Sequence, residues 1–421
     1  NPAPVPALVP APAPTLDMEL TNFLRQQFQM IKRNLLTDRL ELHYRKPTSW
    51  SISEPDTPMP EPNIKPVTSV LTDDALTTIR LTFRPPGGRQ VMAKDLIADV
   101  LSVIGAQNSY HPIRDWLDAL RWDLKPRLDS WLIDYAGVED SPLTRAYGRK
   151  TLCAAVRRLR LPGCKFDHML ILQGAQGIGK SSMIAALSPE PGWVTDQVNA
   201  GDDAREIIEN TNGAWLVELA ELNGFSHREA TRIKSFMTTI VDRARPAYAR
   251  FEIDRPRQFV LFGTTNEARF LRDLTGNRRF WPVIATKCNV KGLTNNRDQI
   301  WAEVRAIEPH EHLWLNTDEL KTAHDAACLN MTDYGPWFDI LNEALPADVA
   351  LKVPVREIWT LAGVGPGNLT ALTRQQTSNM RAALTGLGFD PESRVFTLHG
   401  KNIRAFVRGD LAGAIWWHAD R

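Results

Sequence analysis

The segment Gly174-Ala-Gln-Gly-Ile-Gly-Lys-Ser181 combines the residue types that hold a polyphosphate. It follows an apolar run at 168–172 and precedes a helix-prone stretch at 182–187, the strand, loop and helix order of a phosphate-binding loop. Glycines let consecutive backbone N–H groups curl around phosphate oxygens, and the helix N-terminus adds partial positive charge. A chance glycine-rich turn would not account for both flanks. The segment therefore predicts a site for a nucleoside triphosphate.

Within this loop, Lys180 would reach the β- and γ-phosphates, and Ser181 would hold Mg²⁺. We therefore expect ATP and Mg²⁺ as cofactors. The expected nucleotide-binding residues are Gly174, Gln176, Gly177, Gly179, Lys180, Ser181 and Ser182.

A second apolar run, at 214–219, ends in acidic residues downstream of the loop. Glu218 fits a carboxylate that binds Mg²⁺ directly or through water, at the end of a strand beside the one that carries the loop. Glu221 could polarise the attacking water, although Leu219 stands where a second acid usually follows the first. The alternative is a buried strand that ends in solvated glutamates; the loop upstream favours the catalytic interpretation.

A third apolar run, at 258–263, leads to Asn266. An asparagine at the tip of such a strand can orient the nucleophilic water and sense the γ-phosphate. An asparagine in an ordinary β-turn is the alternative.

Two adjacent arginines, Arg278 and Arg279, follow a Thr-Gly-Asn turn. An arginine at this place can reach the γ-phosphate of a neighbouring subunit and stabilise charge in the transition state. The other interpretation is an ion pair with an acid of the same chain. We expect one arginine in each role, and the sequence does not choose between them.

The segment 232–250 is rich in basic residues and is followed by Arg255 and Arg257. Cations neutralise phosphates and an aromatic ring can stack on a base, which together grip a single strand. Phe236 is assigned to the core, which leaves Tyr248 as the stacking residue. The alternative is a solvated charged surface.

A second basic cluster lies upstream of the loop, where DNA contact and pairing between subunits are equally open. Its members are Arg149, Lys150, Arg157, Arg158, Arg160 and Lys165.

Composition limits the kinds of binding site and the class of protein. The chain has 421 residues and a net charge of +1, so any nucleic-acid site must be a local patch. Four cysteines without a CxxC pair indicate free thiols in a reducing cytoplasm and no zinc site. No apolar run approaches the length of a transmembrane helix, and the chain begins with Asn-Pro without a signal-peptide pattern.

The remaining pattern predicts an α/β protein with several parts. A Pro/Ala spacer at 1–15 suggests a fragment of a longer chain. We expect an α+β accessory region at 16–110, a helical lead-in at 111–160, a P-loop core with a parallel sheet at 161–328, and a small α+β domain at 333–421.

The expected elements outside the motifs follow from apolar periodicity and turn residues. They are a helix at 16–45, a strand at 78–84, a helix at 93–104, helices through 111–160 broken near 125–126 and 141–142, a short strand at 280–284, mostly helix at 297–328, and late strands at 395–398 and 403–408 around the turn 399–402. Helices followed by this hairpin suggest a winged-helix-like C-terminal domain.

Taken in order, these motifs resemble the virulence-associated protein E family of phage and genomic-island proteins. The matching segments are Gly174–Ser182, Val217–Leu222, Asp242–Tyr248, Gly263–Asn266 and Asp273–Pro282, with His111–Leu117, Trp122–Trp131 and Asp298–Glu303 around them. The resemblance covers roughly residues 110–320, and regions 1–110 and 330–421 carry none.

That family is related to superfamily 3 helicases such as the poxvirus-type primase-helicases. The resemblance implies an AAA+-like hexameric ring ATPase that translocates along single-stranded or forked DNA during replication of a mobile element. A primase-polymerase domain often precedes the helicase in such proteins. The DNA-binding positions that it suggests are Lys234, Arg243, Arg245 and Tyr248, and Arg250 of the same basic segment is a further candidate.

The leading hypothesis is therefore a replicative DNA helicase that acts as a homo-oligomeric ring. The alternative is an ATP-switched origin-binding or loader protein without unwinding activity, whose winged-helix-like tail reads duplex DNA. For a defence or signalling ATPase, a third possibility, the sequence offers no distinct effector motif.

Overall fold

The computed structural model describes residues 15–44, 68–83, 92–199, 202–220, 222, 227–244, 252–271, 276–347 and 349–417. The chain divides into two compact units, residues 1–120 and 121–421. Arg245, Tyr248, Arg250 and Glu221 lie outside the described residues. None of the helices within the described residues combines the length and the apolar character that crossing a membrane requires.

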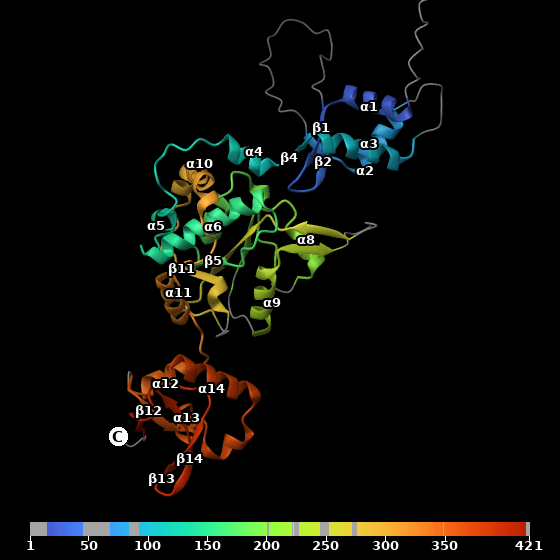
Figure 1. Ribbon diagram of the computed structural model, residues 1–421. Helices are drawn as coiled ribbons and strands as arrows, with labels where there is room; N and C mark the ends of the chain where they lie inside the picture. Colours follow the sequence, from blue (N-terminus) through green and yellow to red (C-terminus); the bar gives the residue numbers. More distant parts are fainter. Residues whose placement is uncertain are drawn as a thin grey trace, which may run out of the picture. The chain divides into compact units, whose positions relative to one another are not determined.

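The first unit is a small sheet with helices (Figure 1). Its elements are α1 (Leu16–Gln27), β1 (Phe28–Asn34), β2 (Arg39–Tyr44), β3 (Thr68–Val70), α2 (Asp73–Thr82), α3 (Lys94–Gln107), β4 (Ser109–Tyr110) and α4 (Pro112–Ala119). The strand order is β3-β2-β1-β4, and β1 pairs antiparallel with β2 and parallel with β4. The helix expected at 93–104 is confirmed as α3.

Two expectations for this unit are wrong. The helix expected at 16–45 ends at Gln27, because Asn34 starts a hairpin turn: its Oδ1 accepts from the backbone N–H of Leu36 at 3.0 Å, and Asp38 adopts φ = 59°. The strand expected at 78–84 is helix α2, whose N-cap Thr72 accepts from the N–H of Ala75. Ile79 and Phe83 are buried at helical i, i+4 spacing whereas Leu81 between them is exposed, so a short alternating window did not separate the two periods.

The second unit contains a five-stranded parallel sheet of order β11-β5-β10-β7-β6. Its strands are β5 (Met169–Gln173), β6 (Val194–Thr195), β7 (Leu216–Leu219), β10 (Val260–Thr265) and β11 (Phe280–Ile284). The four expected strands are confirmed within two residues at each end, and the parallel α/β core with them. One expectation about neighbours is wrong: β10 lies between β5 and β7, so the acid-bearing strand does not pair with the loop-bearing strand.

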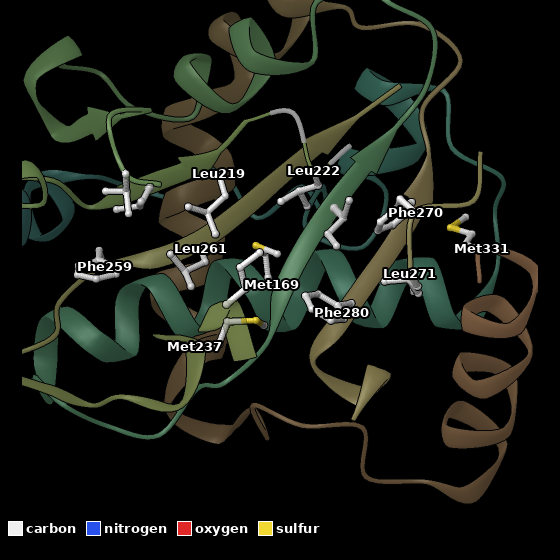
Figure 2. Close-up of a cluster of buried hydrophobic side chains, with 14 of the residues drawn as sticks. Met169, Leu219, Leu222, Met237, Phe259, Leu261, Phe270, Leu271, Phe280 and Met331 are labelled. Atoms are coloured by element: carbon white, nitrogen blue, oxygen red, sulfur yellow. The ribbon is translucent and has the colours of Figure 1, made fainter. Parts of the chain in front are cut away.

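Helices cover this sheet (Figure 1). They are α5 (Trp131–Ala136), α6 (Pro142–Arg160), α7 (Lys180–Ala186), α8 (Ala204–Asn210), α9 (His227–Thr238), α10 (Val290–Ile307) and α11 (Asp318–Asn330). The helices expected through 111–160 and 297–328 are thus confirmed. A buried core against the strands includes Met169, Leu261 and Phe280 of the sheet, Met237 of α9, and Met331 just after α11 (Figure 2).

A two-stranded hairpin, β8 (Val241–Ala244) and β9 (Ile253–Pro256), is inserted in the chain between α9 and β10. Within the basic segment 232–250, the described residues therefore belong to the end of α9, a short connection and β8.

The last part of the second unit has its own core, which includes Leu341, Ile358, Trp359, Met380 and Phe406. Its elements are α12 (Phe338–Ala344), β12 (Leu351–Pro354), α13 (Val355–Leu361), α14 (Arg374–Gly386), β13 (Arg394–Leu398), β14 (Lys401–Arg408) and β15 (Ile415–Trp416). The expected late hairpin is confirmed as β13–β14, with His399 and Gly400 at positive φ in the turn.

Candidate nucleotide site

The loop between β5 and α7 needs its glycines for different reasons. Gly177 and Gly179 adopt φ = 81° and 95°, a backbone conformation that costs other residues strain. Gly174 is needed for a close approach, since a Cβ there would lie 2.3 Å from the carbonyl oxygen of Ala285. The loop joins a strand to a helix in the order that the sequence predicted, and Gln176 is exposed on it.

Lys180 is the first residue of α7 and folds back over the loop. Its Nζ donates to the carbonyl oxygens of Gly174 at 2.8 Å and Ala175 at 2.9 Å, and to Oδ1 of Asn266 at 2.7 Å. The side chain is buried, and this burial lowers the pKa of Lys180, while nearby Cys288 and Glu218 oppose the shift. A partly desolvated ammonium interacts more strongly with an incoming polyanion than a hydrated one does.

Glu218 reaches the first turn of α7 although its strand is not the neighbour of β5. Its Oε1 accepts from the hydroxyl of Ser181 at 2.7 Å and from that of Thr264, on the intervening strand β10, at 2.8 Å. Glu218 is 3% exposed. A carboxylate beside a hydroxyl is the small set of hard oxygen ligands with which proteins bind a hydrated Mg²⁺, so Ser181 and Glu218 fit that ion.

Lys180, Ser181, Glu218 and Asn266 thus come together at the carboxyl end of the sheet, as their positions in the sequence predicted. Ser182 lies on the same first turn of α7 and is exposed. Thr264 was missed. The sequence held a signal for it, because it stands two residues before Asn266 and alternation places both on the same side of the chain.

The arginine turn, residues 276–280, lies at the other end of the sheet. β11 and β5 are parallel, with Phe280 opposite Met169 and Ile284 opposite Gln173. The arginines precede β11, whereas the glycine loop follows β5. Five residues of strand separate the two ends by roughly 16 Å.

The structure also distinguishes the two arginines. The Nε of Arg279 lies 3.8 Å from Oδ2 of Asp167, and its side chain is 20% exposed. Arg278 is exposed. One arginine therefore pairs within its own chain, and the other faces solvent.

Two of the expected DNA-binding residues lie within the described residues, and they differ in exposure. Arg243 on β8 is exposed and forms two hydrogen bonds to Asp254 across the hairpin, at 2.5 and 2.9 Å. Lys234 on α9 is 8% exposed, and its Nζ lies 5.7 Å from the ring centroid of Phe280. In this structure the ammonium of Lys234 lies against the Phe280 ring rather than on the surface, and its contact with DNA stays a prediction.

Both arginines after the basic segment also have partners in the chain. Arg257 is 2% exposed and donates two hydrogen bonds to Asp242, at 2.7 and 2.6 Å. Arg255 donates to Oδ1 of Asn212 at 3.0 Å. Neither offers a bare cation, so the basic surface is smaller than the sequence suggested.

The basic residues on α6 have partners within the chain. Lys150 contacts Glu311 and Arg160 contacts Glu308, each at 2.7 Å. The other contacts are Arg149 with Asp129, Arg157 with Glu308, and Arg158 with the carbonyl oxygens of Phe259 and Phe166. Lys165 is exposed.

Comparison with known proteins agrees with this core. The virulence-associated protein E-like domain matches residues 117–329. The chain belongs to this family. No curated protein matches the chain.

Among solved structures, an apo structure of the NrS-1 C-terminal region is 11% identical, with a TM-score of 0.46, and the match covers 93% of this chain and 99% of that one. A second apo structure of the same region is 13% identical, with a TM-score of 0.46, and the match covers 94% of this chain and all of that one.

Proposed function

We propose that this protein is an ATP- and Mg²⁺-dependent DNA helicase of a phage or mobile genetic element, active as a homo-oligomeric ring. The main support for a ring is the position of Arg278. An exposed arginine at the opposite end of the sheet from its own glycine loop cannot serve its own ATP, but it can serve that of a neighbouring copy.

In this proposal the triphosphate lies in the loop 174–181, with Lys180 exchanging its loop and Asn266 contacts for phosphate oxygens. Ser181 and Glu218 would hold Mg²⁺, which when bound neutralises charge between the β- and γ-phosphates. Asn266, released by Lys180, orients the water together with Glu221. Arg278 of the neighbouring copy stabilises the transition-state charge.

The DNA-gripping part of the proposal is the β8–β9 hairpin. Arg243 on β8 supplies an exposed guanidinium, and Arg245, Tyr248 and Arg250 follow it in the sequence before β9 begins. Cations with one aromatic ring suit a single strand without sequence preference. The replicative role rests on the kinship of the virulence-associated protein E family with superfamily 3 helicases, in which a primase-polymerase domain often precedes this part.

The first test is Lys180→Met, which keeps the volume of the side chain and removes its charge. We expect ATP hydrolysis and strand displacement to fall at least about 100-fold while the circular dichroism spectrum is unchanged. Lys165→Met is the matched control, because Lys165 is exposed and lies outside the site. Normal hydrolysis by the Lys180 variant would end the proposal.

One observation favours the loader alternative as a second function. Helix α14 has no acidic residue, and Arg374, Ser378 and Arg381 are exposed at i, i+4 and i+7, while Met380 and Leu384 of the same helix are buried. With the β13–β14 hairpin beside it in the chain, we propose a winged-helix-like domain whose helix enters a major groove. ATP-dependent duplex binding without strand displacement would favour the loader, whereas displacement with ATPase stimulation by single strands favours the helicase.

A further inference from the structure

The main chain of the arginine turn is held by side chains from two distant segments. The Nδ1 of His168 lies 3.2 Å from the carbonyl oxygen of Arg278. The Sγ of Cys328, on α11, lies 3.8 Å from the carbonyl oxygens of both Asn277 and Phe280. The carbonyl oxygens of Asn277, Arg278 and Phe280 thus each have a side-chain contact, while the side chain of Arg278 remains exposed.

The neighbouring residue is fixed through its side chain. Asp167 pairs with the guanidinium of Arg279, and both side chains are mostly buried. The other carboxylate oxygen of Asp167 lies 4.0 Å from Nε2 of His168. Two consecutive residues just before β5 therefore hold the two consecutive arginines just before β11.

His168 is itself held rigidly and is neutral. Its ring stacks on Trp281 with centroids 4.3 Å apart, and Trp281 stacks on Tyr147 at 5.1 Å. Burial lowers the pKa of His168 to about 4, so near neutral pH the ring carries one proton. With that proton on Nδ1, the ring donates to the carbonyl oxygen of Arg278.

These contacts restrain the main chain from which the Arg278 side chain extends. An exposed arginine on a flexible loop would sample many positions, whereas transition-state stabilisation needs the guanidinium held close to one. We propose that Asp167, His168 and Cys328 are positioning residues, which set Arg278 toward the ATP site of a neighbouring copy of this chain. The inference rests on the shared ATP site proposed above.

A structural role is the competing explanation, because Asp167 and His168 also adjoin the strand that leads to the glycine loop of their own chain. The two explanations differ in where the effect appears. A positioning residue acts on the neighbour's ATP, and a residue that only supports β5 acts on its own.

The test uses rings assembled from two inactive chains, co-expressed with different tags. A Lys180→Ala chain cannot use its own loop but keeps Arg278, so it is the arginine donor. An Arg278→Ala chain keeps its loop, so it is the acceptor. Each chain alone is expected to be inactive, and the mixed ring regains ATP hydrolysis where a donor meets an acceptor.

Asp167→Asn, which keeps the size of the side chain, is then placed in either chain. In the donor we expect hydrolysis by the mixed ring to fall by about 10²-fold, the effect of misplacing a catalytic group by about 1 Å. In the acceptor, which serves as the matched control, we expect no change. Equal loss in both positions, or no loss in either, overturns the inference.

A second pair of variants separates the hydrogen bond of His168 from its packing. His168→Asn in the donor can still donate to the Arg278 carbonyl and should retain more hydrolysis than His168→Ala. Equal activity of these two variants also contradicts the positioning role. If the parental mixture itself shows no hydrolysis, the shared ATP site is refuted first, and the positioning role fails with it.

Discussion

The buried pair of Asp242 and Arg257 gives the sharpest test of how the β8–β9 hairpin is attached to the sheet. The side chains are 7% and 1% exposed and are joined by two hydrogen bonds. The guanidinium also lies 4.3 Å from the ring centroid of Phe236 and 5.2 Å from that of Phe259. The first strand of the hairpin is thereby tied to the residues that lead into β10.

We predict that Asp242→Ala lowers the free energy of unfolding by about 3–5 kcal/mol, because it leaves a buried guanidinium without its carboxylate. Replacing both residues, Asp242→Leu with Arg257→Met, should recover most of that loss. The methionine keeps the contact with Phe236 and Phe259, and no charge remains buried. The hairpin also contains the control: Asp254→Ala breaks an exposed pair with Arg243 and should cost at most about 1 kcal/mol.

The measurement is urea-induced unfolding of the four proteins, followed by circular dichroism. A loss below about 1 kcal/mol for Asp242→Ala would refute the reasoning, since an unpaired buried cation cannot cost so little. A double variant less stable than the single one would refute it equally. In the helicase proposal, the single variant should also lose stimulation of ATP hydrolysis by single-stranded DNA.

Three further predictions concern the site and the arginine turn. Glu218→Gln should retain ATP binding and slow single-turnover hydrolysis by at least about 100-fold; a smaller effect would remove Glu218 from the Mg²⁺ site. Gly174→Ala should abolish nucleotide binding measured by calorimetry, because its Cβ would meet the Ala285 carbonyl, and binding at wild-type affinity would contradict this. Since the pKa of His168 is lowered from 6.5 to about 4, its contribution to stability is full above pH 6.5 and is lost as the pH falls toward 4, by about 3 kcal/mol. His168→Phe should therefore flatten the pH dependence of the unfolding free energy over that range, and an unchanged slope would show the histidine to be unperturbed.

Sequence alone determined the features that depend on a few consecutive residues. The glycine loop needs positive φ at Gly177 and Gly179 and a flanking strand and helix. Residues 168–187 contain the sequence signals for all of these. The apolar strands that end at Glu218 and Asn266 were equally visible, and because parallel strands end at one edge, their tips had to meet.

Local patterns failed where two structures fit the same short window. Residues 28–34 satisfy helical spacing but form β1, since the turn that follows Asn34 allows pairing with 39–44. Residues 78–82 alternate like a strand but form the second half of α2. Pairing partners distant in the chain decide such cases, and a window does not contain them.

Tertiary structure alone decided which charges are available for function. Arg257 and Lys234 looked like surface cations, yet one meets Asp242 and the other the Phe280 ring inside the fold. Arg278 and Arg279 are adjacent and identical in type, and the choice between them depended on Asp167 at the start of a different strand. The type of a residue sets its charge, but long-range contacts decide whether that charge is exposed. The exposure of Arg278 and the pairing of Arg279 therefore follow from the tertiary structure.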